Sequence, residues 1–131
     1  MRTINAERFD EPIKRFRALC LGLPETSEAF SWGHPNFRAG KKTFATVEWF
    51  KGRPSFAFKL GPKTDEELRQ RGSQFFLTPY GRGQWLSMWI DRQVNWRLVK
   101  TLVDRSYRIV ALKRMIGALD GTKQHARSSV R

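Results

Sequence analysis

Residues 43–60 read TFATVEWFKGRPSFAFKL, and their pattern decides the fold class. Thr43 to Trp49 and Ser55 to Leu60 are rich in β-branched and aromatic residues, which are enriched in strands. Lys51-Gly52-Arg53 lies between them and is typical of a tight turn. The stretch therefore predicts two antiparallel strands joined as a hairpin.

The preceding segment continues this pattern toward the N-terminus. Ala29 to Trp32 and Phe37 to Ala39 are two more short strand-like stretches, separated by the turn signal Gly33-His34-Pro35. Gly40-Lys41 then turns the chain into the hairpin. Successive strands with tight connections form an antiparallel meander, and here the turns carry the lysines and arginines.

A helix is predicted before these strands. Asp10 is the expected N-cap, followed by Glu11 in an acidic first turn and by an early proline. Apolar residues then recur at steps of three and four, which indicates an amphipathic helix that ends at Pro24. The apolar stripe consists of Ile13, Phe16, Cys20 and Leu23.

The chain after the hairpin predicts further helices and two more strands. Thr64 and Glu67 match a capping box that starts a short helix to about Arg71. Residues 74–77 and 84–90 are predicted strands, and after them Asn95 is the expected cap of a helical stretch. That stretch continues to Leu119.

These elements predict an α+β fold with an antiparallel sheet packed against an N-terminal helix and C-terminal helices. One domain is expected over residues 1–120, with residues 1–9 as a loose arm. Residues 121–131 offer little apolar surface and are predicted to form a disordered basic tail.

Cysteine content and hydropathy indicate the setting of the protein. Cys20 is the single cysteine, so an intramolecular disulfide is excluded and a cysteine-rich zinc site is not expected. No apolar run approaches the roughly 20 residues of a membrane span, and the N-terminus lacks the hydrophobic region of a secretory signal. We therefore expect a reduced, cytoplasmic monomer with no membrane contact.

Positive charge is the strongest functional signal. The formal net charge is +13, from 25 Lys and Arg against 12 Asp and Glu. Residues 36–63 hold seven basic residues and one acidic residue, and residues 81–119 hold eight and two, whereas residues 1–28 are neutral. Because the excess is regional, it suggests a face that binds a polyanion. A solvated surface that keeps the protein soluble is the alternative interpretation.

Candidate catalytic groups are few. His34 lies in a predicted turn and His125 in the predicted tail, so a two-histidine metal site is not expected. The acidic run 65–67 fits the first turn of a helix better than a cation site. We therefore expect no metal, no cofactor and no enzymatic activity. A weaker hypothesis places a catalytic or small-ligand site around His34, Tyr80 and Trp85.

Several motifs in the same order resemble the MmcQ/YjbR family of small bacterial proteins, whose fold is similar to that of CyaY and the type III secretion chaperones. The resemblance spans about Asp10 to Leu119. It rests on Leu23-Pro24, WGHPNFR at 32–38, KTFA at 42–45, Pro79-Tyr80, GQW at 83–85, VNW at 94–96 and SYRIVA at 106–111. The resemblance implies an α+β fold in which an antiparallel sheet of about five strands packs against helices. In many members a histidine follows the Pro-Tyr pair and an Asn-Lys follows it, whereas this chain has GRGQ at 81–84.

The family is described, from its fold, as DNA-binding through a double-wing motif of β-hairpins. The leading hypothesis is therefore a non-enzymatic DNA-binding protein whose basic turns contact phosphates without sequence specificity. A chaperone-like module that binds an acidic protein partner is the alternative. The expected nucleic-acid contacts are Arg38, Lys41, Lys42, Lys51, Arg53, Lys59 and Arg82.

Overall fold

The structure is a computed structural model that describes residues 9–129. Helix α2 (Asp10–Leu21) precedes the strands β1 (Thr26–Ser31), β2 (His34–Ala39), β3 (Lys42–Phe50) and β4 (Arg53–Lys59). A 3-10 turn η1 (Gly61–Lys63) and helix α3 (Thr64–Arg69) lead to β5 (Phe75–Leu77) and β6 (Trp85–Trp89). The helices α4 (Trp96–Val110) and α5 (Lys113–Ser129) follow.

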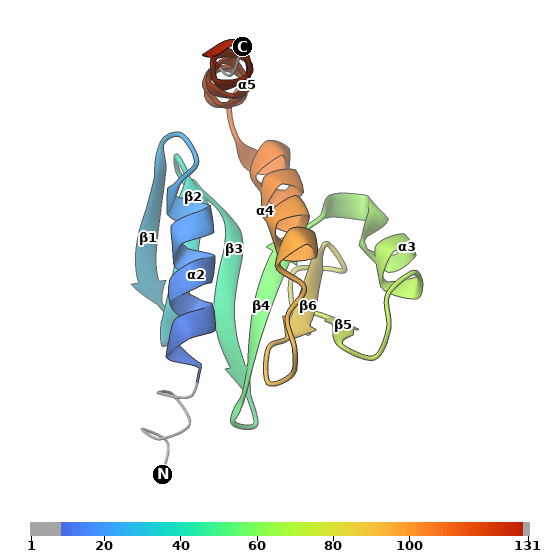
Figure 1. Cartoon of the computed structure of the whole chain (residues 1–131). Helices are drawn as coiled ribbons and strands as arrows, with labels where there is room; N and C mark the ends of the chain where they lie inside the picture. The colour runs from blue at the N-terminus through green and yellow to red at the C-terminus, as the bar shows by residue number, and fades with distance from the viewer. Residues whose placement is uncertain (1–8, 130–131) are drawn as a thin grey trace.

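The strands form one antiparallel sheet in the order β1-β2-β3-β4-β6-β5. This confirms the predicted antiparallel α+β fold, with six strands where the resemblance implied about five. Helices α2 and α4 lie in front of the sheet, α3 lies near the β5–β6 edge, and α5 extends beyond the end of α4 (Figure 1). None of the helices in the described part of the chain is long and apolar enough to cross a membrane.

Strand register separates two faces of the sheet. One row of paired residues includes Phe37, Ala45 and Phe58, and all three are fully buried. Glu28 belongs to the same row and accepts a 2.7 Å hydrogen bond from Arg17 of α2, so this front face lies under the helices. Because neighbouring residues of a strand point to opposite faces, the next row belongs to the rear face. The rear row consists of Asn36, Thr46, Ala57, Ser87 and Phe76.

Aromatic residues join the helices to the front face. Phe16 of α2 stacks on Phe56 with the ring centroids 3.9 Å apart. Tyr107 of α4 packs edge-on against Phe44 and donates a 2.7 Å hydrogen bond to the carbonyl of Pro24. Such ring pairs add about 0.5–1.5 kcal/mol each to the free energy of area burial. The same region holds Cys20, whose burial raises the pKa of the thiol.

Helix starts follow the predictions in part. Asn95 caps α4 as predicted, because its Oδ1 accepts a 3.2 Å hydrogen bond from the amide of Leu98. Asp10 lies inside the first turn of α2 instead of capping it. The predicted cap Thr64 is also wrong: its φ and ψ of −60° and −42° are helical, whereas an N-cap residue is extended. Its hydroxyl donates to the carbonyl of Gly61 at 2.7 Å.

Helix α5 is longer than predicted. The sequence predicted disorder from Gly121, but the helix continues to Ser129. Buried Met115 and Leu119 anchor its first part. Gly121 does not end the helix, because a glycine inside a helix costs only about 1 kcal/mol relative to alanine. Residues 1–8 of the predicted arm and residues 130–131 of the predicted tail lie outside the described residues. Phe9, the last residue of that arm, packs against the core.

Candidate functional site

The two predicted basic turns lie at opposite ends of β3. The β2–β3 turn contains Gly40 and Lys41, and the β3–β4 turn contains Lys51 and Gly52. Nine residues of β3 separate them, which is roughly 30 Å at about 3.3 Å per residue. The two turns therefore do not form one continuous basic stripe.

The β2–β3 turn packs beside the junction of α4 and α5. Lys41, Lys42 and Arg114 line a hollow of about 440 Å³ there, together with the apolar Val110, Leu112 and Met115. Gly40 has a φ of 60°, and a Cβ at this position would lie 2.9 Å from Cε of Met115. The positive φ favours glycine at this position, and the terminal methyl of Met115 occupies the space beside it. Arg114 also donates a 2.9 Å hydrogen bond to Glu25.

The β3–β4 turn presents less free charge. Arg53 donates hydrogen bonds of 2.6 and 3.2 Å to the two carboxylate oxygens of Asp91. Its guanidinium also lies 3.9 Å from the ring centroid of Trp89. Hydrogen bonding to Arg53 holds the pKa of Asp91 below its ordinary value. Lys51 is exposed in this turn.

A second hollow, of about 410 Å³, opens on the rear side of the sheet. It brings together His34, Tyr80 and Trp85, the three residues of the weaker small-ligand hypothesis, although they come from β2, the β5–β6 loop and β6. Trp32 of the β1–β2 turn also lines it, and 94% of this side chain is exposed. The other lining residues are Asn36, Thr43 and Thr46.

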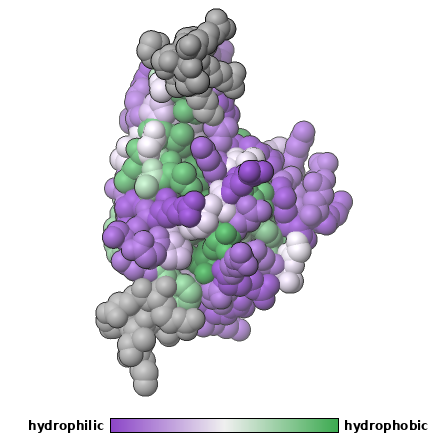
Figure 2. Space-filling view, in the orientation of Figure 1, coloured by the Kyte–Doolittle hydropathy of each residue, from purple (hydrophilic) through white to green (hydrophobic). Residues whose placement is uncertain are grey.

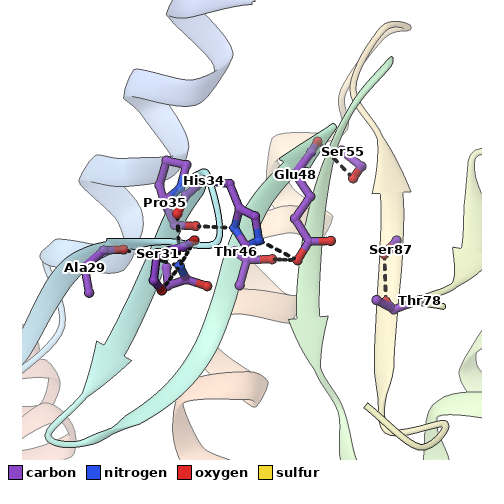
Figure 3. A network of polar contacts seen from close by, with 10 residues as sticks. Ala29, Ser31, His34, Pro35, Thr46, Glu48, Ser55, Thr78 and Ser87 are labelled. Carbon is purple, nitrogen blue, oxygen red and sulfur yellow. Dashed lines mark hydrogen bonds and ion pairs between the residues drawn. The ribbon is translucent and has the colours of Figure 1, made fainter. Parts of the chain in front are cut away.

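Polar side chains of β2 and β3 line this hollow or lie next to its lining. Figure 3 shows the contacts among His34, Thr46 and Glu48. Asn36 donates from Nδ2 to the carbonyl of His34 at 2.9 Å and to Ser31 Oγ at 3.0 Å, which holds the β1–β2 hairpin together. Thr46 donates from Oγ1 to Oε2 of Glu48 at 3.0 Å, and Nε2 of His34 lies 3.6 Å from the same oxygen. The other carboxylate oxygen of Glu48, Oε1, is buried without a partner among the described residues.

The remaining predicted contacts lie near the rear hollow. Arg38 is paired with Thr43 across β2 and β3, and Lys59 is paired with Trp85 across β4 and β6. Cross-strand partners point to the same face of a sheet, so both cations lie next to residues that line the hollow. Arg82 is exposed in the β5–β6 loop and has a φ of 55°.

The helix-covered side carries a different surface. Leu19, Leu23 and Val103 line a hollow between α2 and α4, together with the polar Lys100, Thr101 and Asp104. Figure 2 shows this side, with hydrophobic surface beside the helices and hydrophilic surface around it. Arg15 lies over the ring of Trp96 nearby, 4.5 Å from its centroid.

Comparisons with known proteins assign the family. A model of the YjbR family matches residues 21–109. The chain belongs to the YjbR family. The structure is similar to a Deinococcus radiodurans protein with a DUF419 domain, at a TM-score of 0.66 and 22% identity over 82% of this chain and 87% of that one. It is also similar to a Pseudomonas syringae protein, at a TM-score of 0.54 and 13% identity over 66% and 87% of the two chains. No curated protein matches the sequence.

Sequence reasoning missed one member of the site in this YjbR-family protein. Sequence reasoning used Glu48 only in the charge count, as the one acidic residue of 36–63. In the structure its side chain is 4% exposed and lies beside the residues that line the rear hollow. A carboxylate placed between two apolar neighbours in a predicted strand was the available signal. Among the described residues, no three His, Cys, Asp or Glu side chains come together as metal ligands.

Proposed function

We propose that this YjbR-family protein is a non-enzymatic nucleic-acid-binding protein that contacts the phosphates of duplex DNA through one basic end. The basic end is defined here as Lys41, Lys42, Lys113 and Arg114. The observation that supports it is that Lys41, Lys42 and Arg114 line one hollow, although more than 70 residues separate Arg114 from the two lysines in the sequence. Lys113 precedes Arg114 and is exposed.

The free charge at this end supports the proposal. Lys41, Lys42 and Lys113 have no acidic partner within 4.0 Å among residues 9–122, the residues with described side chains. Arg114 has Glu25, but this ion pair is exposed, and such pairs exchange readily for other anions because each contributes little. Phosphates would meet unpaired cations here, whereas Arg53 at the opposite end is already bound to Asp91.

Phosphate contacts also explain why no base-reading element is needed. Contacts to the backbone position a protein on DNA but carry no sequence information. Their affinity comes from released counterions, so it falls as salt rises. We therefore expect binding that is sequence-independent and sensitive to salt.

A chaperone-like role with an acidic protein partner is the second candidate. It is supported by the surface between α2 and α4, where Leu19 and Leu23 lie beside Lys100. An apolar patch bordered by positive charge suits a partner with apolar and acidic side chains.

The test is a titration of labelled duplex DNA across a salt series. Wild-type affinity should fall with a log–log slope of about −3, from roughly −0.9 for each of three or four phosphate contacts. Lys41→Ala, Lys42→Ala and Lys113→Ala together should remove most of that slope, for random and defined sequences alike. The matched control replaces Lys51, Lys63 and Lys100, which are also exposed lysines, and should keep the wild-type slope.

Two outcomes would reject the basic end as the contact surface. The first is an equal loss of affinity in both triple variants, because the effect would then follow net charge alone. The second is a lack of binding at low salt. If an acidic polypeptide binds instead, and binding is lost in Leu19→Ser, the protein-partner candidate replaces this one.

A further inference from the structure

The rear hollow is suited to a small ligand and lies apart from the basic end. Its volume of about 410 Å³ falls within the ~300–1,000 Å³ of small-molecule sites. Its lining combines three aromatic side chains with a floor of polar ones. The aromatic walls are Trp32, Tyr80 and Trp85.

The aromatic walls Tyr80 and Trp85 do not cover one another. Tyr80 and Trp85 are tilted by 46° with centroids 6.4 Å apart, so neither ring is stacked face to face on the other. Trp32 is almost fully exposed at the mouth, where a bound ligand would remove its apolar surface from water. Aromatic side chains arranged in this way favour stacking on a heterocyclic base.

Trp85 is held in place by the backbone of the β5–β6 loop. Gly81 has a φ of 84°, and a Cβ there would overlap Cδ1 of Trp85. The absent side chain lets the indole lie against the loop. This close approach fixes one wall of the hollow independently of any ligand.

The floor offers acceptors for the N–H groups of such a base. Asn36 uses Nδ2 to hold the hairpin, while its Oδ1 has no hydrogen bond to a described residue. Thr46 donates its proton to Glu48, which leaves its hydroxyl oxygen free to accept. The ring nitrogens of His34 lie 3.5 and 3.6 Å from their closest oxygen partners, beyond the usual hydrogen-bond distance of about 2.7–3.2 Å.

Two cations flank the same hollow. Arg38 is the cross-strand partner of Thr43, and Lys59 is the cross-strand partner of Trp85. Neither has a carboxylate within 4.0 Å among the described side chains, and Nε of Arg38 is buried without a partner. An anionic group attached to the planar ring would satisfy both, whereas a cationic ligand would be repelled.

We propose that the rear hollow binds a nucleotide. Its base stacks among Trp32, Tyr80 and Trp85, the N–H groups of the base meet the floor, and its phosphate lies toward Arg38 and Lys59. This inference is independent of the basic end, because a duplex keeps its bases stacked and paired and so cannot place one in the hollow. A free nucleotide and the end of a single strand share the required chemistry.

The experiment measures quenching of tryptophan fluorescence, with calorimetry, for four kinds of probe. These are the nucleoside 5′-monophosphates, the corresponding nucleosides, inorganic phosphate and a short single-stranded oligonucleotide. At least one monophosphate should bind one-to-one. Its nucleoside should bind at least tenfold more weakly. Inorganic phosphate should not quench the tryptophan fluorescence. If the oligonucleotide binds and no monophosphate does, the ligand is the end of a single strand, bound through the same stacking and phosphate contacts.

Variants of the protein test the contacts to the base and to the phosphate one at a time. Tyr80→Ala should weaken the nucleotide and the nucleoside by roughly tenfold, because stacking on one ring is lost, while Tyr80→Phe should keep wild-type affinity. Arg38→Ala with Lys59→Ala should reduce the nucleotide to the affinity of the nucleoside and leave the nucleoside unchanged. Tyr80 is partly exposed in a loop, so its replacement is expected to leave the fold intact, as a thermal melt can verify.

The results also keep the two proposals apart. The Lys41, Lys42 and Lys113 triple variant should bind the nucleotide as the wild type does, and Tyr80→Ala should bind duplex DNA as the wild type does. Failure of every nucleotide and oligonucleotide to bind at millimolar concentration would overturn the inference. Binding that none of the Tyr80, Arg38 and Lys59 replacements changes would also overturn it.

Discussion

At the scale of single residues, Glu48 shows how a carboxyl group is held in the sheet of a basic protein. Its side chain is 4% exposed, with one oxygen bonded to Thr46 and the other unpartnered among the described residues. Burial raises the pKa of Glu48, although the hydrogen bond from Thr46 and the nearby His34 act against the rise. The folded protein therefore retains this proton to a higher pH than the unfolded chain does.

We predict that Glu48→Gln stabilises the protein at neutral pH by roughly 1 kcal/mol, because it removes a charge whose oxygen lacks a partner. The sign follows from linkage. A raised folded pKa penalises folding above the ordinary value of 4.5, and the penalty disappears as the pH falls below that value. Denaturant unfolding at pH 7 and pH 4 should therefore show a gain only at pH 7. The exposed Glu66→Gln is the control, and an equal gain there would contradict the explanation.

At the scale of elements, α5 depends on a few buried contacts near its start. Met115 and Leu119 are 1% and 8% exposed, and the residues from Asp120 to Thr122 are exposed. Met115 fills the space left by Gly40 in the β2–β3 turn. The helix thereby connects the core to the turn that carries Lys41 and Lys42.

Met115→Ala should lower the free energy of unfolding by about 2–5 kcal/mol, as for other large-to-small replacements in cores. Thermal melts test this, with the exposed Leu112→Ala as the control.

A chain ending after Thr122 should melt within a few degrees of the full chain, because it retains both buried residues and the Arg108–Asp120 ion pair. Thermal melts of the two chains test this prediction. A large loss of stability on truncation would show that residues beyond 122 pack against the domain.

The elements also show how far the sequence alone predicts this protein. Strand composition and turn residues predicted the meander β1–β4, because local patterning decides strands and tight turns. The Thr64 cap failed because η1 runs directly into α3, so Thr64 already has helical φ and ψ and its hydroxyl donates back to Gly61. The rear hollow brings Trp32, Tyr80 and Trp85 together from a turn, a loop and a strand. The sequence hypothesis of a site around His34, Tyr80 and Trp85 left out Trp32, because no local pattern shows which turn lies beside which loop.

At the scale of the whole molecule, ion pairs connect distant parts of a chain with a net charge of +13. Glu25 binds Arg114, Glu67 binds Arg105, and Asp91 binds Arg53. The hydrogen bond from Arg114 lowers the pKa of Glu25, and that from Arg53 lowers the pKa of Asp91. Burial alone would raise the pKa of Glu67, but Arg71 and Arg105 hold it below its ordinary value.

These groups predict a protein that is sensitive to acid. A lowered folded pKa contributes stability that is present above the ordinary values of 4.5 for Glu and 3.8 for Asp, and is lost as the pH falls through the folded pKa. Protonation also adds positive charge to a molecule that already repels itself. Because Glu48 acts in the opposite direction, the measurement is cleanest in Glu48→Gln: its Tm should fall by several degrees between pH 6 and pH 3. Adding Asp91→Asn should lower the Tm at pH 6 and make the decline shallower, since one of the titrating pairs is gone. A Tm that stays constant to pH 3, or an Asp91→Asn variant that declines as steeply, would show that these ion pairs do not stabilise the fold.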